Sequence, residues 1–201
     1  MTIALLVEGE TERTFVPHLR RFLQPRLAGR MPRLDPVPFD GRIPKDDKLK
    51  RIVERLLRGR QAADAVIALS DVYTGTREFE DAGDAKRKMR EWVGPNQKFF
   101  PHAAQYDFEA WLLPFWDDIQ RLAGHNMAPP SGPPESVDHM RPPAAHIEEI
   151  FRAGSRGRKY VKARDAERIL RENDLGEAAA ACPELRALLN TILQLCEVAP
   201  I

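Results

Sequence analysis

Two short, uninterrupted runs of apolar residues constrain the fold of this chain more than any other feature. They cover residues 3–7 (Ile-Ala-Leu-Leu-Val) and residues 65–69 (Ala-Val-Ile-Ala-Leu). Such runs are typical of strands that are buried on both faces of a parallel sheet. The first is followed by apolar residues at helical spacing between residues 15 and 23, and strands that alternate with helices imply crossover connections. The sequence therefore predicts an α/β fold, a three-layer sandwich with a mostly parallel sheet.

The remaining elements are less strongly marked. Residues 49–57 repeat the helical stripe, and residues 98–102 are expected to form another strand. Residues 34–39 contain prolines, which cannot donate to a sheet ladder, so we expect at most an edge strand there. A turn-rich stretch follows the second apolar run, and residues 108–122 carry the spacing of one long amphipathic helix.

The composition changes after residue 124, which suggests three segments. Residues 1–124 form the predicted α/β domain. Residues 125–146 contain six prolines and are expected to be a linker or an ordered extended loop. Helical stripes return in residues 147–201, which we expect to form a small helical C-terminal cap on the sheet domain.

Charge and cysteine content exclude several classes of protein. Lys and Arg total 31 and Asp and Glu total 30, a net charge of +1, so any basic surface must be local. Cys182 and Cys196 are too few for a disulfide framework or a zinc cluster. No stretch has the ~20 apolar residues of a membrane span, and the first apolar run has no basic residues before it, as a signal peptide would. We expect a cytoplasmic protein without membrane association.

Acidic residues stand at the end of both apolar runs. Glu8 directly follows the first, and Asp71 follows the second after Ser70. Since ligands of open parallel sheets bind beyond the carboxyl ends of the strands, these two side chains are candidates for one site. Two neighbouring carboxylates require a cation or a shared proton, and oxygen ligands without Cys or His favour Mg²⁺ or Mn²⁺. A helix start at residues 8–12 and an Asx turn at Asp71 are the structural alternatives.

A third acidic group precedes the predicted long helix. Asp107 has the position of a helix N-cap, and Glu109 that of a first-turn acid favoured by the helix dipole. Taken alone, this group favours the structural interpretation. This group, however, also lies at the end of a predicted strand. When all three acidic groups are considered together, a shared functional site gains support.

Four motifs, in this order, resemble a family of unknown function that is related to the Toprim fold of topoisomerases, primases and overcoming-lysogenization-defect nucleases. They are Val7-Glu8-Gly9-Glu10-Thr11-Glu12, Asp71-Val72-Tyr73-Thr74-Gly75 with Phe79, Phe100-Pro101, and Asp107-Phe108-Glu109-Ala110-Trp111-Leu112. The resemblance implies that Glu8 is a general acid or base and that Asp71 is a metal ligand. Tyr73 stands where the family pattern has a second aspartate, and Tyr is a poor Mg²⁺ ligand. Glu109 is the expected replacement, with Gly9, Glu12, Tyr73 and Asp107 in supporting positions.

A basic cluster lies between residues 152 and 168. Its candidate nucleic-acid contacts are Arg156, Arg158, Lys159 and Lys162, and Tyr160 could stack on a base. Charge runs of this kind are also typical of a solvated helix surface. Both interpretations remain open at the level of sequence.

These observations predict a Mg²⁺-dependent or Mn²⁺-dependent Toprim-like nuclease, or nuclease subunit, that acts on DNA or RNA. The resemblance further implies an ATPase partner and a role in bacterial phage defence, because related families lie beside ATPases in such loci. The chain has no P-loop, nucleophile elbow or dinucleotide fingerprint of its own. The alternative is a catalytically degenerate binding or regulatory subunit.

Overall fold

The protein is described by a computed structural model that covers residues 1–201 except 30, 40, 74–77, 138–140 and 155–158. Its centre is a parallel sheet of four strands in the order β2-β1-β3-β4. The strands are β1 (Thr2–Val7), β2 (Arg33–Pro38), β3 (Ala65–Asp71) and β4 (Phe99–Ala104). The predicted α/β fold with a parallel sheet is confirmed, and the proline-containing strand β2 lies at the edge as expected.

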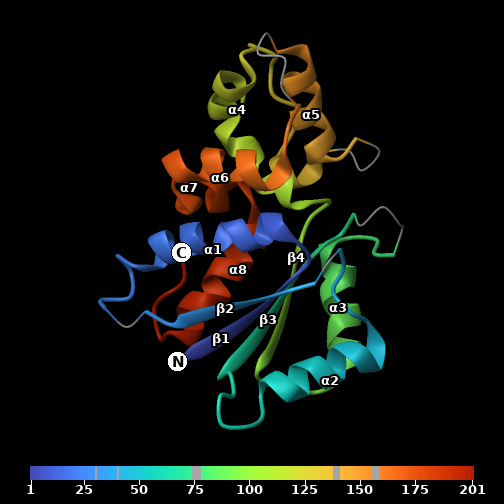
Figure 1. Ribbon diagram of the computed structural model, residues 1–201, viewed down its shortest axis with the longest axis vertical. Coiled ribbons are helices and arrows are strands. Elements are labelled where there is room, and N and C mark those ends of the chain that lie inside the picture. The colour runs from blue at the N-terminus through green and yellow to red at the C-terminus, as the bar shows by residue number, and fades with distance from the viewer. Residues whose placement is uncertain (30, 40, 74–77, 138–140, 155–158) are drawn as a thin grey trace.

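Helices cover both faces of the sheet, as Figure 1 shows. Helices α1 (Glu10–Leu23) and α8 (Pro183–Leu195) lie on one face, and α2 (Asp46–Leu56) and α3 (Ala82–Val93) lie on the other. Alternate residues of β1 serve the two faces, because successive side chains of a strand point in opposite directions. Ile3, Leu5 and Val7 join the core beneath α1, and Ala4 and Leu6 join the core beneath α2 and α3. Burial on both faces is why these strands are continuous apolar runs.

The remaining helices extend the α1 side of the molecule. They are α4 (Trp116–Ala123), α5 (Pro143–Ala153), α6 (Lys162–Glu172) and α7 (Leu175–Ala181), with short 3-10 helices η1 (Phe108–Phe115) and η2 (Pro134–Ser136). Helices α4 and α5 form the end of the molecule farthest from the sheet in Figure 1. Helix α6 lies along α1, and Ile169 and Leu170 share the core of β1 and α1. Residues from both ends of the sequence therefore build one apolar core.

Two helices differ from the sequence-based expectation. The predicted long helix 108–122 is divided into η1 and α4, with Pro114 inside η1. Proline has no N–H to donate and its ring clashes with the preceding turn, so a continuous α-helix is unfavourable there. Helix α3 (Ala82–Val93), which begins near the end of the turn-rich stretch, was not predicted. Its signals were the N-cap Asp81, which accepts a hydrogen bond from the Asp84 N–H at 2.7 Å, and Gly94 at its end.

None of the helices in the described part of the chain is both long and apolar enough to cross a membrane.

Candidate functional site at the carboxyl edge of the sheet

The parallel topology brings the predicted acidic residues to one edge of the sheet. Glu8 directly follows β1, and Asp71 is the last residue of the neighbouring strand β3. Asp107 and Glu109 follow β4, which pairs with β3, and Glu12 lies in the first turn of α1. The carboxyl group of Asp71 is close enough to the other four for each of their charges to raise its pKa. We call Glu8, Glu12, Asp71, Asp107 and Glu109 the acidic cluster.

The acidic cluster is withdrawn from solvent. Glu8, Glu12, Asp107 and Glu109 are each no more than 7% exposed, and Asp71 is partly exposed. Because burial penalises a charged carboxylate, it raises the pKa of Glu8 to about 7 and that of Asp107 to about 8. Burial, followed by the charges of its neighbours, also raises the pKa of Asp71 well above its ordinary value. The cluster therefore holds more negative charge than its surroundings stabilise, which favours protons or a bound cation.

Glu8 is held in place from the α2 and α3 side of the sheet. Its Oε1 accepts a hydrogen bond from the Ser70 hydroxyl at 2.5 Å and one from the Ile43 N–H at 3.5 Å. A cavity of about 10 Å³, the room of about one water molecule, is lined by Glu8, Ser70 and Arg42 among others. A positioned carboxyl group with a pKa near 7 can take up and release a proton at neutral pH.

Asp107 has the position of an N-cap but does not act as one. Its side chain makes no capping hydrogen bond to η1. Instead, Oδ2 accepts the Ala144 N–H of α5 at 3.2 Å, and Oδ1 is buried without a hydrogen-bond partner among the described residues. A capping hydrogen bond of full geometry is therefore absent, although the Glu109 N–H still interacts with this carboxyl group and lowers its pKa. A buried oxygen without a donor is a position where a cation or water would be stabilising.

Glu109 lies at the junction of the sheet and the C-terminal helices. Its carboxylate accepts the Tyr160 hydroxyl at 3.2 Å and pairs with the Lys162 ammonium group at 3.3 Å. Desolvation lowers the pKa of Lys162, but the charges of Glu109, Asp107 and Asp71 outweigh it and raise that pKa. Since the Lys162 side chain is 49% exposed, its positive charge faces both the cluster and the solvent.

The structure thus brings together Glu8, Asp71, Glu109, Glu12 and Asp107, and adds Lys162 to them. Gly9 is the extended N-cap residue of α1, beside the Glu12 carboxylate. The Tyr73 side chain is 37% exposed, while its N–H donates to the Tyr106 carbonyl at 2.5 Å. Lys159 is exposed, and the predicted contacts Arg156 and Arg158 lie outside the described residues.

Two participants were missed or assigned differently at the level of sequence. Ser70 was not singled out, although a hydroxyl residue that ends an apolar run directly before Asp71 was an available signal. Tyr160 was considered only as a base-stacking residue, and its contact with Glu109 depends on the fold of residues far apart in the sequence.

The donor chemistry of the cluster suits a hard cation. Its side chains offer carboxylate oxygens without sulfur or imidazole, which Mg²⁺ and Mn²⁺ prefer, and the unpartnered Asp107 Oδ1 is a further oxygen donor. Within the described residues, no three His, Cys, Asp or Glu side chains are already arranged to hold a metal ion. The residues therefore fit a cation by chemistry rather than by a preformed cage.

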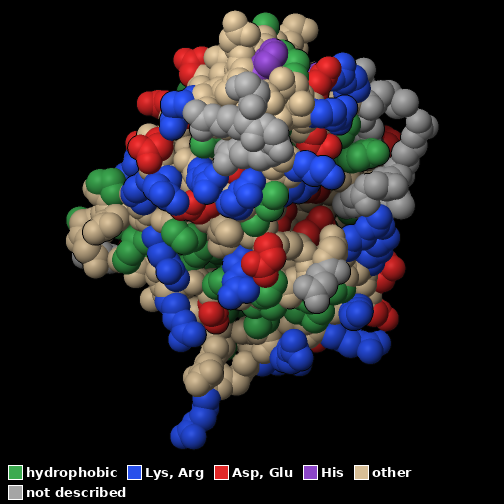
Figure 2. All heavy atoms as spheres, turned by 45° about the horizontal axis from the view of Figure 1, so that its top comes forward, with side chains coloured by type: hydrophobic (Ala, Val, Ile, Leu, Met, Phe, Trp, Pro, Cys, Tyr) green, Lys and Arg blue, Asp and Glu red, His purple; other side chains and the backbone are tan. Residues whose placement is uncertain are grey.

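Basic side chains also gather on the surface of the protein. Figure 2 shows Lys and Arg side chains in a band across the middle of one face, with acidic side chains between them. Because the net charge is only +1, this band is a local feature of the surface.

Comparisons with known proteins agree with this architecture. The structure is similar to the C-terminal region of the Burkholderia pseudomallei OLD protein, with a TM-score of 0.52, 11% identity and coverage of 96% of this chain and 98% of that chain. The C-terminal region of the Xanthomonas campestris pv. campestris OLD protein gives a TM-score of 0.42 at 12% identity, with 96% and 97% covered. A comparison with curated proteins finds no match.

The family described as "Domain of unknown function (DUF4276)" matches residues 7–193, which include the whole acidic cluster. The chain therefore belongs to the DUF4276 family.

Proposed function

We propose that this protein is a Mg²⁺-dependent or Mn²⁺-dependent nuclease, or the nuclease subunit of a complex, which cleaves phosphodiester bonds in DNA or RNA. The observation that carries the proposal is the gathering of five carboxyl groups at the carboxyl edge of a parallel sheet. The likeness of the fold to the C-terminal region of an OLD protein supports it, as does the resemblance of the motifs to overcoming-lysogenization-defect nucleases.

Glu8, Asp71 and Glu109 are the proposed ligands of the cation. A bound divalent cation would polarise a phosphoryl oxygen and lower the pKa of an attacking water molecule. It would also offset the mutual repulsion of the carboxylates, which adds to the cost of burying them in the unliganded cluster.

The other proposed roles are those of protein side chains rather than of the bound cation. Glu8, whose carboxyl oxygen is fixed by the Ser70 hydroxyl, is placed to hold or move a proton at Oε1 or Oε2. Lys159 and Lys162 supply positive charge for the phosphate backbone, and Lys162 is both paired with Glu109 of the cluster and 49% exposed.

Partners and cellular role follow from the resemblance only. We propose a cytoplasmic protein that works with an ATPase in phage defence. Residues 1–201 contain no ATPase motif, so that activity would come from outside this sequence.

A second candidate function is a binding or regulatory subunit without catalysis. Tyr73 favours it, because the resemblance places a metal-binding aspartate at this position and Tyr is a poor ligand for Mg²⁺. The Lys162 ammonium group on Glu109 favours it as well, since it already supplies one positive charge to the cluster.

A cleavage assay distinguishes the two functions. Single-stranded DNA, duplex DNA and structured RNA are incubated with Mg²⁺ or Mn²⁺, with and without the neighbouring ATPase. Asp71→Ala and Glu109→Ala are each expected to abolish cleavage. Glu8→Gln is expected to reduce the rate by roughly 10²-fold or more, while Asp71 and Glu109 retain much of the metal affinity. An inert wild-type complex under all conditions, or full activity of Glu109→Ala, would favour the binding subunit.

A further inference from the structure

A cavity of about 450 Å³ is connected to the acidic cluster through one of its lining residues. Among the described residues it is lined by Glu148 and Arg152 of α5 and by Lys159 and Tyr160, which precede α6. We call it the Tyr160 cavity. Tyr160 belongs to both places, because its hydroxyl donates to Glu109 Oε1 at 3.2 Å while the residue lines the cavity. Tyr160 is therefore the residue through which a molecule in the cavity would be coupled to the acidic cluster.

The lining of the Tyr160 cavity combines an aromatic ring with charged groups. The Tyr160 ring is half-buried and is held edge-on against Phe151, with 5.4 Å between the ring centroids. Arg152, Lys159 and Glu148 are exposed and surround it. An aromatic ring binds nucleobases of any sequence by stacking, and Arg and Lys bind phosphate. A carboxylate accepts hydrogen bonds from the amino groups of bases. The volume lies within the ~300–1,000 Å³ range of small-ligand sites.

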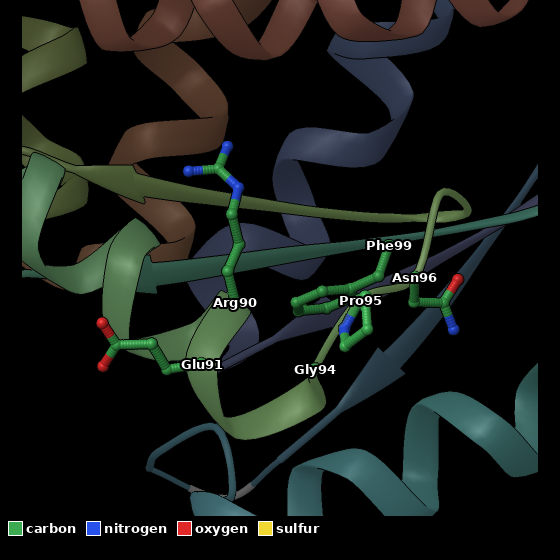
Figure 3. Close-up of a pocket in the computed structure, with 6 residues that line it drawn as sticks. All are labelled: Arg90, Glu91, Gly94, Pro95, Asn96 and Phe99. Atoms are coloured by element: carbon green, nitrogen blue, oxygen red, sulfur yellow. The ribbon is translucent and has the colours of Figure 1, made fainter.

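Two other cavities also combine aromatic and charged residues, but they lie away from the acidic cluster. One, of about 540 Å³, is lined by Arg90, Gly94, Pro95 and Phe99 among others (Figure 3). Phe99 begins β4, so this cavity lies at the amino edge of the sheet, opposite the acidic cluster. The other, of about 300 Å³, includes Arg21, whose guanidinium group already donates to the Leu170 carbonyl at 2.5 Å at the end of α6.

We propose that the Tyr160 cavity binds an unpaired nucleobase of a single-stranded DNA or RNA next to the phosphate held at the acidic cluster. This inference rests on the proposed function and specifies its substrate. A base within a duplex is paired and stacked, so its faces are not available to the ring unless it is flipped out at a cost of a few kcal/mol. The substrate is therefore single-stranded, or a duplex with unpaired nucleotides.

The test measures binding rather than cleavage. Affinity is determined by fluorescence anisotropy with Ca²⁺ in place of Mg²⁺, for a labelled single strand, its duplex, and a strand of the same length without bases. The wild type is expected to bind the base-containing strand about tenfold more tightly than the abasic strand. Tyr160→Leu should reduce that ratio to about 1, and Tyr160→Phe, which keeps the ring and removes the contact with Glu109, should preserve it.

Further variants keep the test decisive if Tyr160→Leu fails to fold. Arg152→Glu, at an exposed position, should weaken single-strand binding at least fivefold, whereas Lys50→Glu at an exposed position on α2 should leave it unchanged. Equal affinity of the wild type for base-containing and abasic strands would overturn the inference. So would saturation by a free mononucleotide at the affinity of the full strand, because the cavity would then serve a small ligand. If the wild type prefers the base-containing strand but cleaves no substrate, the proposed catalysis is rejected and the assignment of the cavity is retained.

Discussion

The Glu8 carboxyl group makes the stability of the protein depend on pH. Its pKa rises from 4.5 to about 7 on folding, mainly through burial, so the folded state binds more protons than the unfolded state in this interval. The contribution of Glu8 to the free energy of unfolding is therefore largest below pH 4.5. It falls by up to about 3 kcal/mol as the pH rises to 7. In Glu8→Gln this contribution is absent, because the amide does not titrate.

Urea denaturation in EDTA at several pH values checks this prediction. The free energy of unfolding of Glu8→Gln is expected to change less than that of the wild type between pH 4.5 and 7. Asp107, whose pKa is also raised, titrates in both proteins, so the difference between the curves reports Glu8 together with the effect of its charge on Asp71. Identical slopes for the two proteins would show that Glu8 is not buried as described.

At the residue scale, the sequence predicted which carboxylates gather but not all of their environments. Glu8 and Asp71 were predictable because each ends a continuous apolar run. Glu12 was adequately explained by the helix dipole, and only the packing of α1 against α6 reveals that it is buried near Lys162. Lys162 is predicted from the sequence to contact nucleic acid, and the structure adds its pairing with Glu109.

At the scale of elements, the start of α6 determines where Lys162 lies. The carboxylate of Asp165 is completely buried. It accepts a hydrogen bond from the Val161 N–H at 2.9 Å and two from the guanidinium group of Arg164. Asp165→Ala removes these hydrogen bonds to a charged group and is expected to destabilise the protein by about 2 kcal/mol. Chemical denaturation measures the change.

A control on the same helix separates this effect from general loss of charge. Glu167→Ala removes an i,i+4 pair with the exposed Arg171 and should cost less than about 0.5 kcal/mol. Equal effects of the two substitutions would mean that Asp165 does not anchor the helix start.

The contact between the end of α5 and the end of α4 depends on Gly154. A Cβ atom at this position would lie 2.0 Å from the Ala123 carbonyl oxygen, so backbone must move to admit it. Gly154→Ala is expected to destabilise the protein by roughly 1–3 kcal/mol, the usual cost of overpacking. Ala153→Ser, at the exposed neighbouring position, is the matched control for a thermal melt. A melting temperature of Gly154→Ala equal to that of the control would contradict the close approach.

Local sequence signals predicted elements well where periodicity was strong. Strands β1 and β3 and helices α1 and α2 carry clear apolar patterns. Helix α3 buries Ala82, Ala85 and Met89, and its small alanine side chains give a weak stripe among glycine and charged residues. The division of residues 108–122 followed from Pro114, a signal that competed with an otherwise continuous apolar stripe.

At the scale of the whole molecule, the acidic cluster makes folding and cation binding interdependent. A cation that binds only the folded state adds RT ln(1 + [L]/Kd) to stability, about 2.7 kcal/mol at a hundredfold excess over Kd. Mg²⁺ is therefore expected to raise the melting temperature of the wild type, and much less that of Asp71→Asn. Calorimetry with Mg²⁺ against EDTA measures both shifts, and equal shifts would locate the stabilising cation elsewhere.

The global arrangement was predictable because parallel strands impose it. Once β1, β3 and β4 are parallel neighbours, the residues that follow them must share an edge. The joining of the C-terminal helices to that edge was not predictable, because no local pattern specifies that Tyr160 and Lys162 meet Glu109, which lies about fifty residues earlier.

Direct measurement of Mn²⁺ binding tests the central claim that the acidic cluster is a cation site. Electron paramagnetic resonance counts free Mn²⁺ during titration of the wild type, Asp71→Asn, and Asp47→Asn as a control at an exposed position on α2. The account predicts saturable binding to the wild type and to Asp47→Asn, and an affinity at least tenfold lower for Asp71→Asn. Equal affinities for all three proteins, or no saturable binding to the wild type, would contradict it.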